Sequence, residues 1–65
     1  MAAQWTGEVV GKMHLNGITI KALAAHLGYS HEYTGKVLSG KRTPSNAEQT
    51  FRKAVEELIA ARNIA

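Results

Sequence analysis

Residues 20–39, IKALAAHLGYSHEYTGKVLS, contain two short helical segments separated by a tight turn. A helix-turn-helix needs a small residue where its second helix crosses the first, and Ala24 stands at that position. Four residues later it needs a residue that tolerates a positive φ, and Gly28 meets this requirement. The flanking core positions are apolar: Leu23, Leu27 and Val37. The stretch therefore predicts a helix-turn-helix.

Each of the two helical segments begins at a hydroxyl side chain. Thr19 is placed to cap a helix over about 20–27, and Ser30 a helix over about 31–39, because a hydroxyl oxygen accepts a free N–H of the first turn. Gly40 follows as a helix stop. Helices this short do not persist alone in water, so we expect them to brace each other and the flanking segments.

The segment before this motif has the spacing of an amphipathic helix over about 4–16. Trp5, Val9 and Met13 stand four residues apart. Val10 is expected to widen this apolar stripe.

The segment after the motif carries the clearest helix signals. Pro44 suits a first helical position with Thr43 as its cap, and Ser45 to Glu48 reads as a capping box one step later. We expect Trp5 to pack on Phe51, which joins the first helix to the last. Apolar residues continue along the last helix at helical spacing: Phe51, Ala54, Val55, Leu58 and Ile59.

No part of the chain alternates with the period of two that a half-buried strand requires. The predicted fold is therefore all-α, a small bundle of four helices, or five, with the helix-turn-helix at its centre. At 65 residues and 45% hydrophobic composition, residues 1–65 are expected to form a single domain. No apolar run approaches the length of a membrane span.

The composition excludes several classes of chemistry. The chain has no cysteine, which removes disulfides and thiolate metal sites. Its histidines, His14, His26 and His31, do not have the spacing of a zinc site. There is no Gly-rich phosphate loop, no Ser/His/Asp set and no inward-facing pair of carboxylates. We therefore expect a non-enzyme with no cofactor, no metal and no small-molecule substrate.

The net charge of +3 lies entirely in the middle of the chain. Between residues 17 and 45, Lys21, Lys36, Lys41 and Arg42 are opposed only by Glu32, whereas the flanking segments sum to zero. A basic segment of this kind favours a polyanionic partner such as nucleic acid.

Two stretches resemble a known family. LAAHLGYS over residues 23–30 and VLSGKRTPS over residues 37–45 are similar to the Cro/C1-type helix-turn-helix of the xenobiotic-response-element family, which includes many small phage repressors. The resemblance extends over residues 17–58. It implies a lambda-repressor-like DNA-binding domain that regulates transcription, encoded by a phage or prophage and located on the nucleoid in the bacterial cytoplasm.

The chain departs from this family at Thr34, where the family usually has Ile or Val. A threonine can be buried there if its hydroxyl bonds back to the preceding helical turn. We expect Tyr33 beside it to pack its ring on the domain while its hydroxyl reaches a phosphate.

The resemblance places the second helix of the motif in the major groove, with its N-terminal residues at the base edges. Lys36 is expected to donate to guanine O6 and N7, and Glu32 to accept from the cytosine N4 amine. Gly35 allows a close approach of the helix. The predicted base-reading residues are Ser30, His31, Glu32, Gly35 and Lys36.

Contacts to phosphates are expected from the residues that flank the reading helix. Lys41 and Arg42 precede the expected start of the last helix, where a cation is unfavourable unless an anion lies between it and the positive end of the helix dipole. The predicted phosphate-binding residues are Thr19, Lys21, Tyr33, Ser39, Lys41, Arg42 and Thr43.

The expected partner is double-stranded DNA, with an inverted-repeat operator read by a homodimer. The expected pairing surface is the apolar end of the last helix, Leu58 to Ile64, together with the exposed part of the first helix. The alternative is a helix-turn-helix adaptor, or a DNA-positioning component of a larger assembly such as phage packaging or excision machinery.

Overall fold

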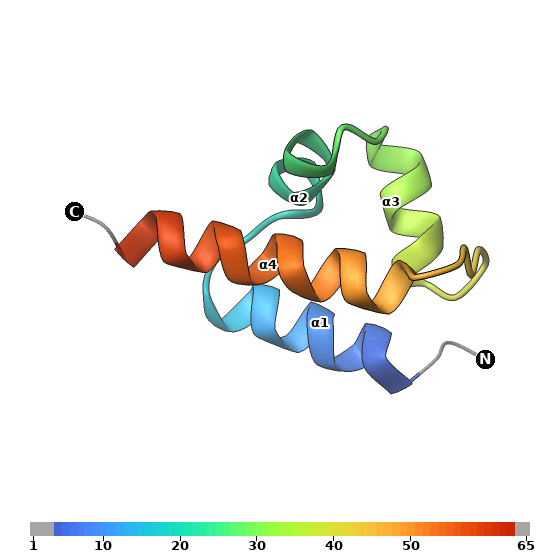
Figure 1. The fold of residues 1–65 in the computed structure, drawn as a ribbon, viewed down its shortest axis with the longest axis horizontal. Helices are drawn as coiled ribbons and strands as arrows, with labels where there is room; N and C mark the ends of the chain where they lie inside the picture. Colours follow the sequence, from blue (N-terminus) through green and yellow to red (C-terminus); the bar gives the residue numbers. More distant parts are fainter. Residues whose placement is uncertain (1–3, 64–65) are drawn as a thin grey trace.

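The computed structural model describes residues 4–63, and all regular structure in that range is helical (Figure 1). This confirms the predicted all-α bundle of four helices, with no fifth helix and no strand among the described residues. No helix in this range has the length and apolar composition needed to cross a lipid bilayer. The helices are α1 (Gln4–Leu15), α2 (Ile20–Leu27), α3 (His31–Leu38) and α4 (Ala47–Asn63).

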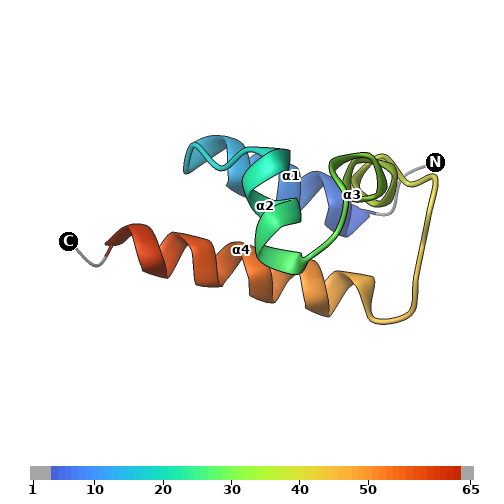
Figure 2. The same cartoon turned by 90° about the horizontal axis from the view of Figure 1, so that it is seen from above.

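Figures 1 and 2 show α1 and α4 side by side, running in the same direction, with α2 and α3 on one side of this pair. The helix α2 packs against α3 and α4, and α1 packs against α4 and α3. Seen from above, α3 is viewed almost end-on and lies across the direction of α4 (Figure 2). This arrangement leaves one long face of α3 uncovered.

Phe51 of α4 lies at the centre of the core and is 1% exposed. Its ring contacts that of Trp5 edge-on at a centroid distance of 5.9 Å, and that of Tyr29 at 6.3 Å. The expected contact between the first and last helices through Trp5 and Phe51 is thereby confirmed. The other buried apolar side chains are Val9, Met13, Ile18, Leu23, Ala24, Val37, Leu38, Ala47, Ala54 and Val55.

The turn between α2 and α3 has the predicted caps. Thr19 Oγ1 accepts the Ala22 N–H at 3.0 Å, and Ser30 Oγ accepts the Tyr33 N–H at 3.0 Å. Gly28 ends α2 with a φ of 77°, the left-handed region that was expected of it. The helix α3 is one residue shorter than predicted, because Ser39 is its C-terminal cap.

Thr34 is fully buried, and its hydroxyl donates to the Ser30 carbonyl oxygen at 2.9 Å. This is the back-bond expected for a threonine at an apolar position. The polar atom is satisfied inside α3, so the substitution of threonine for an aliphatic residue is compatible with a closed core.

The predicted start of α4 is wrong. The helix begins at Ala47, after both Pro44 and Ser45, and Asn46 just before it has a φ of 61°. The Asn46 carbonyl accepts the Thr50 N–H at 2.9 Å, so Asn46 stands at the cap and Glu48 is one position too early for a capping box. The Glu48 carboxylate instead accepts from Arg52 Nε at 2.9 Å.

The expectation that Val10 widens the apolar stripe of α1 is also wrong, because Val10 is 43% exposed. The buried face of α1 is centred on Val9 and Met13 and includes Thr6, at 2% exposure. The helices α3 and α4 cover α1 from this side, so the stripe widens toward Thr6 instead.

Candidate nucleic-acid interface

The uncovered face of α3 carries the residues predicted to read bases. Thr34, Val37 and Leu38 point into the core, so the positions one turn apart on the opposite side face outward. Ser30, His31 and Glu32 are exposed, and Gly35 and Lys36 are half-buried. Together, this polar face of α3 consists of Ser30, His31, Glu32, Gly35 and Lys36.

Glu32 and Lys36 form an ion pair along this face, with Lys36 Nζ 3.2 Å from Glu32 Oε1. Glu32 lies in the first turn of α3 and Lys36 in the last. Each charge therefore lies at the end of the helix dipole that stabilises it. The pair also has the favourable order for an i, i+4 contact on a helix, with the acidic residue first.

The two capping hydroxyls keep a proton available. Thr19 and Ser30 use their oxygens as acceptors for backbone N–H groups, which leaves each O–H free to donate. Because both side chains are exposed, their hydroxyl groups can reach a phosphate or a base edge while they cap.

The charged side chains of α1 and α4 are largely paired with one another. Arg52 bonds to Glu8 and to Glu48, at 2.9 Å each, and Lys12 bonds to Glu56. The pKa of Arg52 is raised by these contacts, first by the hydrogen bond to Glu8 and then by that to Glu48. These charges stabilise the packing of α1 on α4 and are balanced locally.

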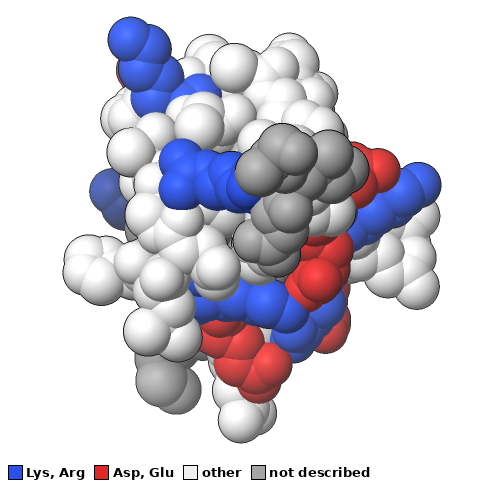
Figure 3. Space-filling model, turned by 90° about the vertical axis from the view of Figure 1, so that its left-hand side faces the viewer, with Lys and Arg blue, Asp and Glu red and all other residues white. Residues whose placement is uncertain are grey.

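In contrast, no acidic side chain within residues 4–63 pairs with Lys21, Lys41 or Arg42. All three are exposed. Figure 3 views the end at which α4 finishes and shows acidic side chains beside basic ones over its lower right, with mainly basic side chains over its upper left. Within residues 4–63, the middle segment thus contributes three of the cations that form no ion pair, and α4 contributes the others, Lys53 and Arg62.

The loop that carries Lys41 and Arg42 folds back onto the end of α3. Lys36 O accepts the N–H of Lys41 at 2.9 Å and of Arg42 at 3.3 Å, and also the Ser39 hydroxyl at 3.1 Å. These bonds hold the backbone of Lys41 and Arg42 at the carboxyl end of α3.

Because of this placement, the helix dipole of α4 no longer indicates an anion at Lys41 and Arg42. The expected dipole conflict depended on a start of α4 beside Pro44, and the helix begins at Ala47. The two cations instead follow the carboxyl end of α3, where positive charge is favourable without any ligand. Their relevance to DNA therefore depends on their exposure and on their position beside α3. Thr43 continues this exposed loop.

Tyr33 is half-buried, and its ring meets that of Tyr29 edge-on at a centroid distance of 5.1 Å. The expectation that its ring packs on the domain is confirmed. The contact of its hydroxyl with a phosphate stays a prediction.

Tyr29 was missed by sequence reasoning. It is 40% exposed in the turn just before α3, and its ring is held by contacts with Tyr33 and Phe51. The signal that indicates it is the spacing of two tyrosines four residues apart across the helix start, which brings their rings together. Tyr29 directly precedes Ser30 and therefore adjoins the candidate interface.

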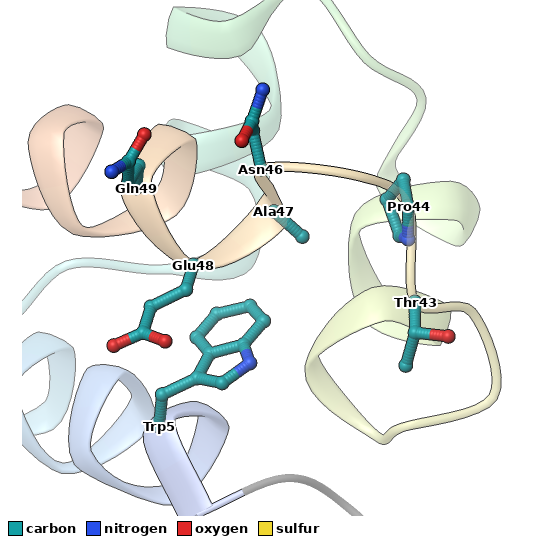
Figure 4. A pocket seen from close by; sticks show the side chains of 7 residues that line it. All are labelled: Trp5, Thr43, Pro44, Asn46, Ala47, Glu48 and Gln49. Carbon is teal, nitrogen blue, oxygen red and sulfur yellow. The ribbon is translucent and has the colours of Figure 1, made fainter.

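A shallow open pocket of about 330 Å³ lies at the start of α4 (Figure 4). The Trp5 indole and the Glu48 side chain lie next to each other, with Thr43 and Pro44 across from them (Figure 4). Thr43 belongs both to this pocket and to the loop that carries Lys41 and Arg42. The fluorescence of Trp5 should therefore respond to a change in the conformation of this loop or to a ligand that binds there.

The surface expected to pair two copies is only partly available. Leu58 and Ile59 are half-buried and pack on the core of their own chain. Ile64 lies outside the described residues. On α1, Leu15 is 87% exposed, so the apolar part of the predicted surface that the structure leaves open is on the first helix.

His26 lies on α2 and contacts α4, with its Nε2 2.8 Å from Glu57 Oε1. The His26 side chain is 35% exposed. Within residues 4–63, no three His, Cys, Asp or Glu side chains come together as a possible metal site.

The contact between His26 and Glu57 predicts an acid-dependent loss of stability. The hydrogen bond to His26 is the largest cause that lowers the pKa of Glu57 from its ordinary value of 4.5. A lowered pKa in the folded state adds stability that is present above about pH 4.5 and is lost as the pH falls through the lowered value. Chemical unfolding of the wild type and of Glu57→Gln between pH 3 and 7 measures this. The wild type should be the more stable at pH 6, and the difference should vanish at the acid end. A difference that is constant over the whole range would contradict it.

Comparisons of this chain with protein-family models, with curated proteins and with solved structures find no match. The resemblance to the Cro/C1-type family therefore stays a prediction.

Proposed function

We propose that this protein binds double-stranded DNA in a sequence-specific manner and regulates transcription as a Cro-type repressor. The helix α3 enters the major groove with its polar face. The observation that carries the proposal is the uncovered polar face of α3, which is followed at its carboxyl end by Lys41 and Arg42, two exposed cations that have no acidic partner among the described residues.

A domain of this size makes few base contacts, and useful affinity then requires two copies. The proposal therefore includes a homodimer on an inverted repeat whose half-sites lie about 34 Å, one helical turn, apart. The exposed apolar side chains of α1, above all Leu15, support a contact between copies. The setting that fits this role is the nucleoid in a bacterial cytoplasm.

Selection of bound duplexes from a randomised DNA library at about 150 mM salt tests the function. An enriched inverted repeat with centres about ten base pairs apart supports the dimeric regulator. A single short half-site supports DNA reading by one copy and contradicts the dimer. The absence of any enrichment would contradict sequence-specific binding and favour the adaptor or assembly component.

Gly35 gives a prediction that separates binding from folding. A Cβ at this position meets no other atom within 4 Å, so Gly35→Ala should raise the free energy of unfolding by about 0.5–1 kcal/mol. The same methyl group would project from the polar face of α3 toward the groove and should weaken DNA binding by about 1–3 kcal/mol. Thermal unfolding and a binding titration measure the two effects.

The matched control is Gly7→Ala on α1, two helical turns before Leu15, where a Cβ also meets nothing within 4 Å. This variant should gain similar stability and keep its affinity for DNA. Equal affinities for the two variants would show that α3 does not approach the DNA closely at Gly35.

A further inference from the structure

The Glu32–Lys36 ion pair presents an acceptor and a donor next to each other on the polar face of α3. The carboxylate and ammonium groups are 3.2 Å apart, and the side chains of Glu32 and Lys36 are 79% and 42% exposed. Gly35 adjoins Lys36, and the space a Cβ would occupy there is open. Both side chains of the pair are therefore accessible to solvent, Glu32 more than Lys36.

Pairing leaves most of the hydrogen-bonding capacity of both groups unused. A carboxylate offers about four acceptor sites and an ammonium group three donors, and one mutual contact occupies one of each. The pair can therefore stay intact and still bind a partner that presents a donor beside an acceptor.

A C·G base pair presents this pattern in the major groove. The cytosine N4 amine is a donor, and guanine O6 and N7 beside it are both acceptors. An A·T pair also places a donor beside an acceptor, but it fits less well. The adenine N7 acceptor would face the carboxylate, and thymine offers the ammonium group one acceptor next to a methyl group.

We propose that Glu32 and Lys36 read one C·G base pair as a single unit. Glu32 accepts from the cytosine N4 amine while Lys36 donates to guanine O6 and N7. This inference rests on the proposed docking of α3 in the major groove.

The unit also accounts for an acidic residue on a surface that faces DNA. A lone carboxylate would be repelled by the phosphates, whereas Lys36 balances the charge of Glu32 at 3.2 Å. Glu32 then adds selectivity without adding net negative charge.

The charge-swapped variant E32K/K36E tests the inference. It keeps an ion pair at the same spacing but reverses the order of donor and acceptor along α3. Library selection with this variant should therefore change one base pair of the preferred site from C·G to G·C and leave the other positions unchanged. The matched control K12E/E56K swaps an exposed pair between α1 and α4 and should select the wild-type site.

Circular dichroism establishes whether the swapped variant folds, because the swap places each charge at the unfavourable end of α3. If it does not fold, E32Q, K36Q and E32Q/K36Q replace it. For each variant, the measured quantity is the ratio of its affinity for the C·G site to its affinity for a site changed at that base pair. This ratio should fall about ten- to a hundred-fold in each single variant. The double variant should lose much less than the product of the two, because the groups act together.

The outcomes separate this inference from the proposed function. If the wild type enriches no sequence, DNA reading is overturned and the inference with it. Two other results would overturn only the reading of C·G by the pair as a unit. In the first, the wild type selects a site and the folded swap variant prefers the same base pair. In the second, the affinity losses of the two single variants multiply in the double variant.

Discussion

Replacement of Phe51 by alanine is expected to lower the free energy of unfolding by about 3–5 kcal/mol. The ring is 1% exposed and joins Trp5 of α1 to Tyr29 in the turn before α3. Its removal leaves a cavity at the point where these segments meet. A domain of this length has a total stability of only about 3–10 kcal/mol, so much of the population should unfold. Urea denaturation followed by circular dichroism measures the loss.

Val10→Ala is the matched control, since it also removes apolar atoms, but from a side chain that is 43% exposed. We expect its unfolding free energy to change by about 0.5 kcal/mol or less. If Phe51→Ala were as mild as Val10→Ala, the ring would not be the centre of the core.

The second large effect concerns salt. The double variant K41Q/R42Q should bind every DNA sequence more weakly, and the slope of log affinity against log salt should fall by about two units. The reason is that each phosphate contact releases about one condensed counterion. Both cations are exposed and without an acidic partner in residues 4–63. Titrations of specific and random duplexes between about 50 and 200 mM salt measure the slope.

The control K12Q/K53Q removes the same charge from α1 and α4. Lys12 is paired with Glu56, and Lys53 lies near Glu57, whose pKa it helps to lower. This variant should keep the wild-type slope. Equal losses from the two double variants would indicate diffuse attraction by net charge and would remove the phosphate role from Lys41 and Arg42.

Local features of the fold were predictable from the sequence. The caps Thr19 and Ser30, the turn at Gly28 and the back-bond of Thr34 all depend on contacts within about four residues of the side chain concerned. The outward face of α3 follows from helical periodicity in the same way. Interactions of this range are specified by near neighbours, so the sequence contains them directly.

The start of α4 was not predictable in this way, because Pro44 and Ser45 are two adequate local signals and neither is used. The loop before α4 is bonded back to the Lys36 carbonyl, and Ala47 is buried in the core. These contacts select the later start. They outweigh the cost of a positive φ at Asn46, a residue that tolerates it.

The composition of the candidate site was predictable by residue type, and its electrostatic state was decided by tertiary structure. The sequence by itself determined that Lys21, Lys41 and Arg42 lie in a basic middle segment next to a helix with a polar outer face. Only the packing of α1 on α4 decided which charges are neutralised, since Arg52 meets Glu8 and Lys12 meets Glu56 across 44 residues of chain. The physical reason is that an ion pair depends on distance in space, which the order of residues does not contain once the chain folds back on itself.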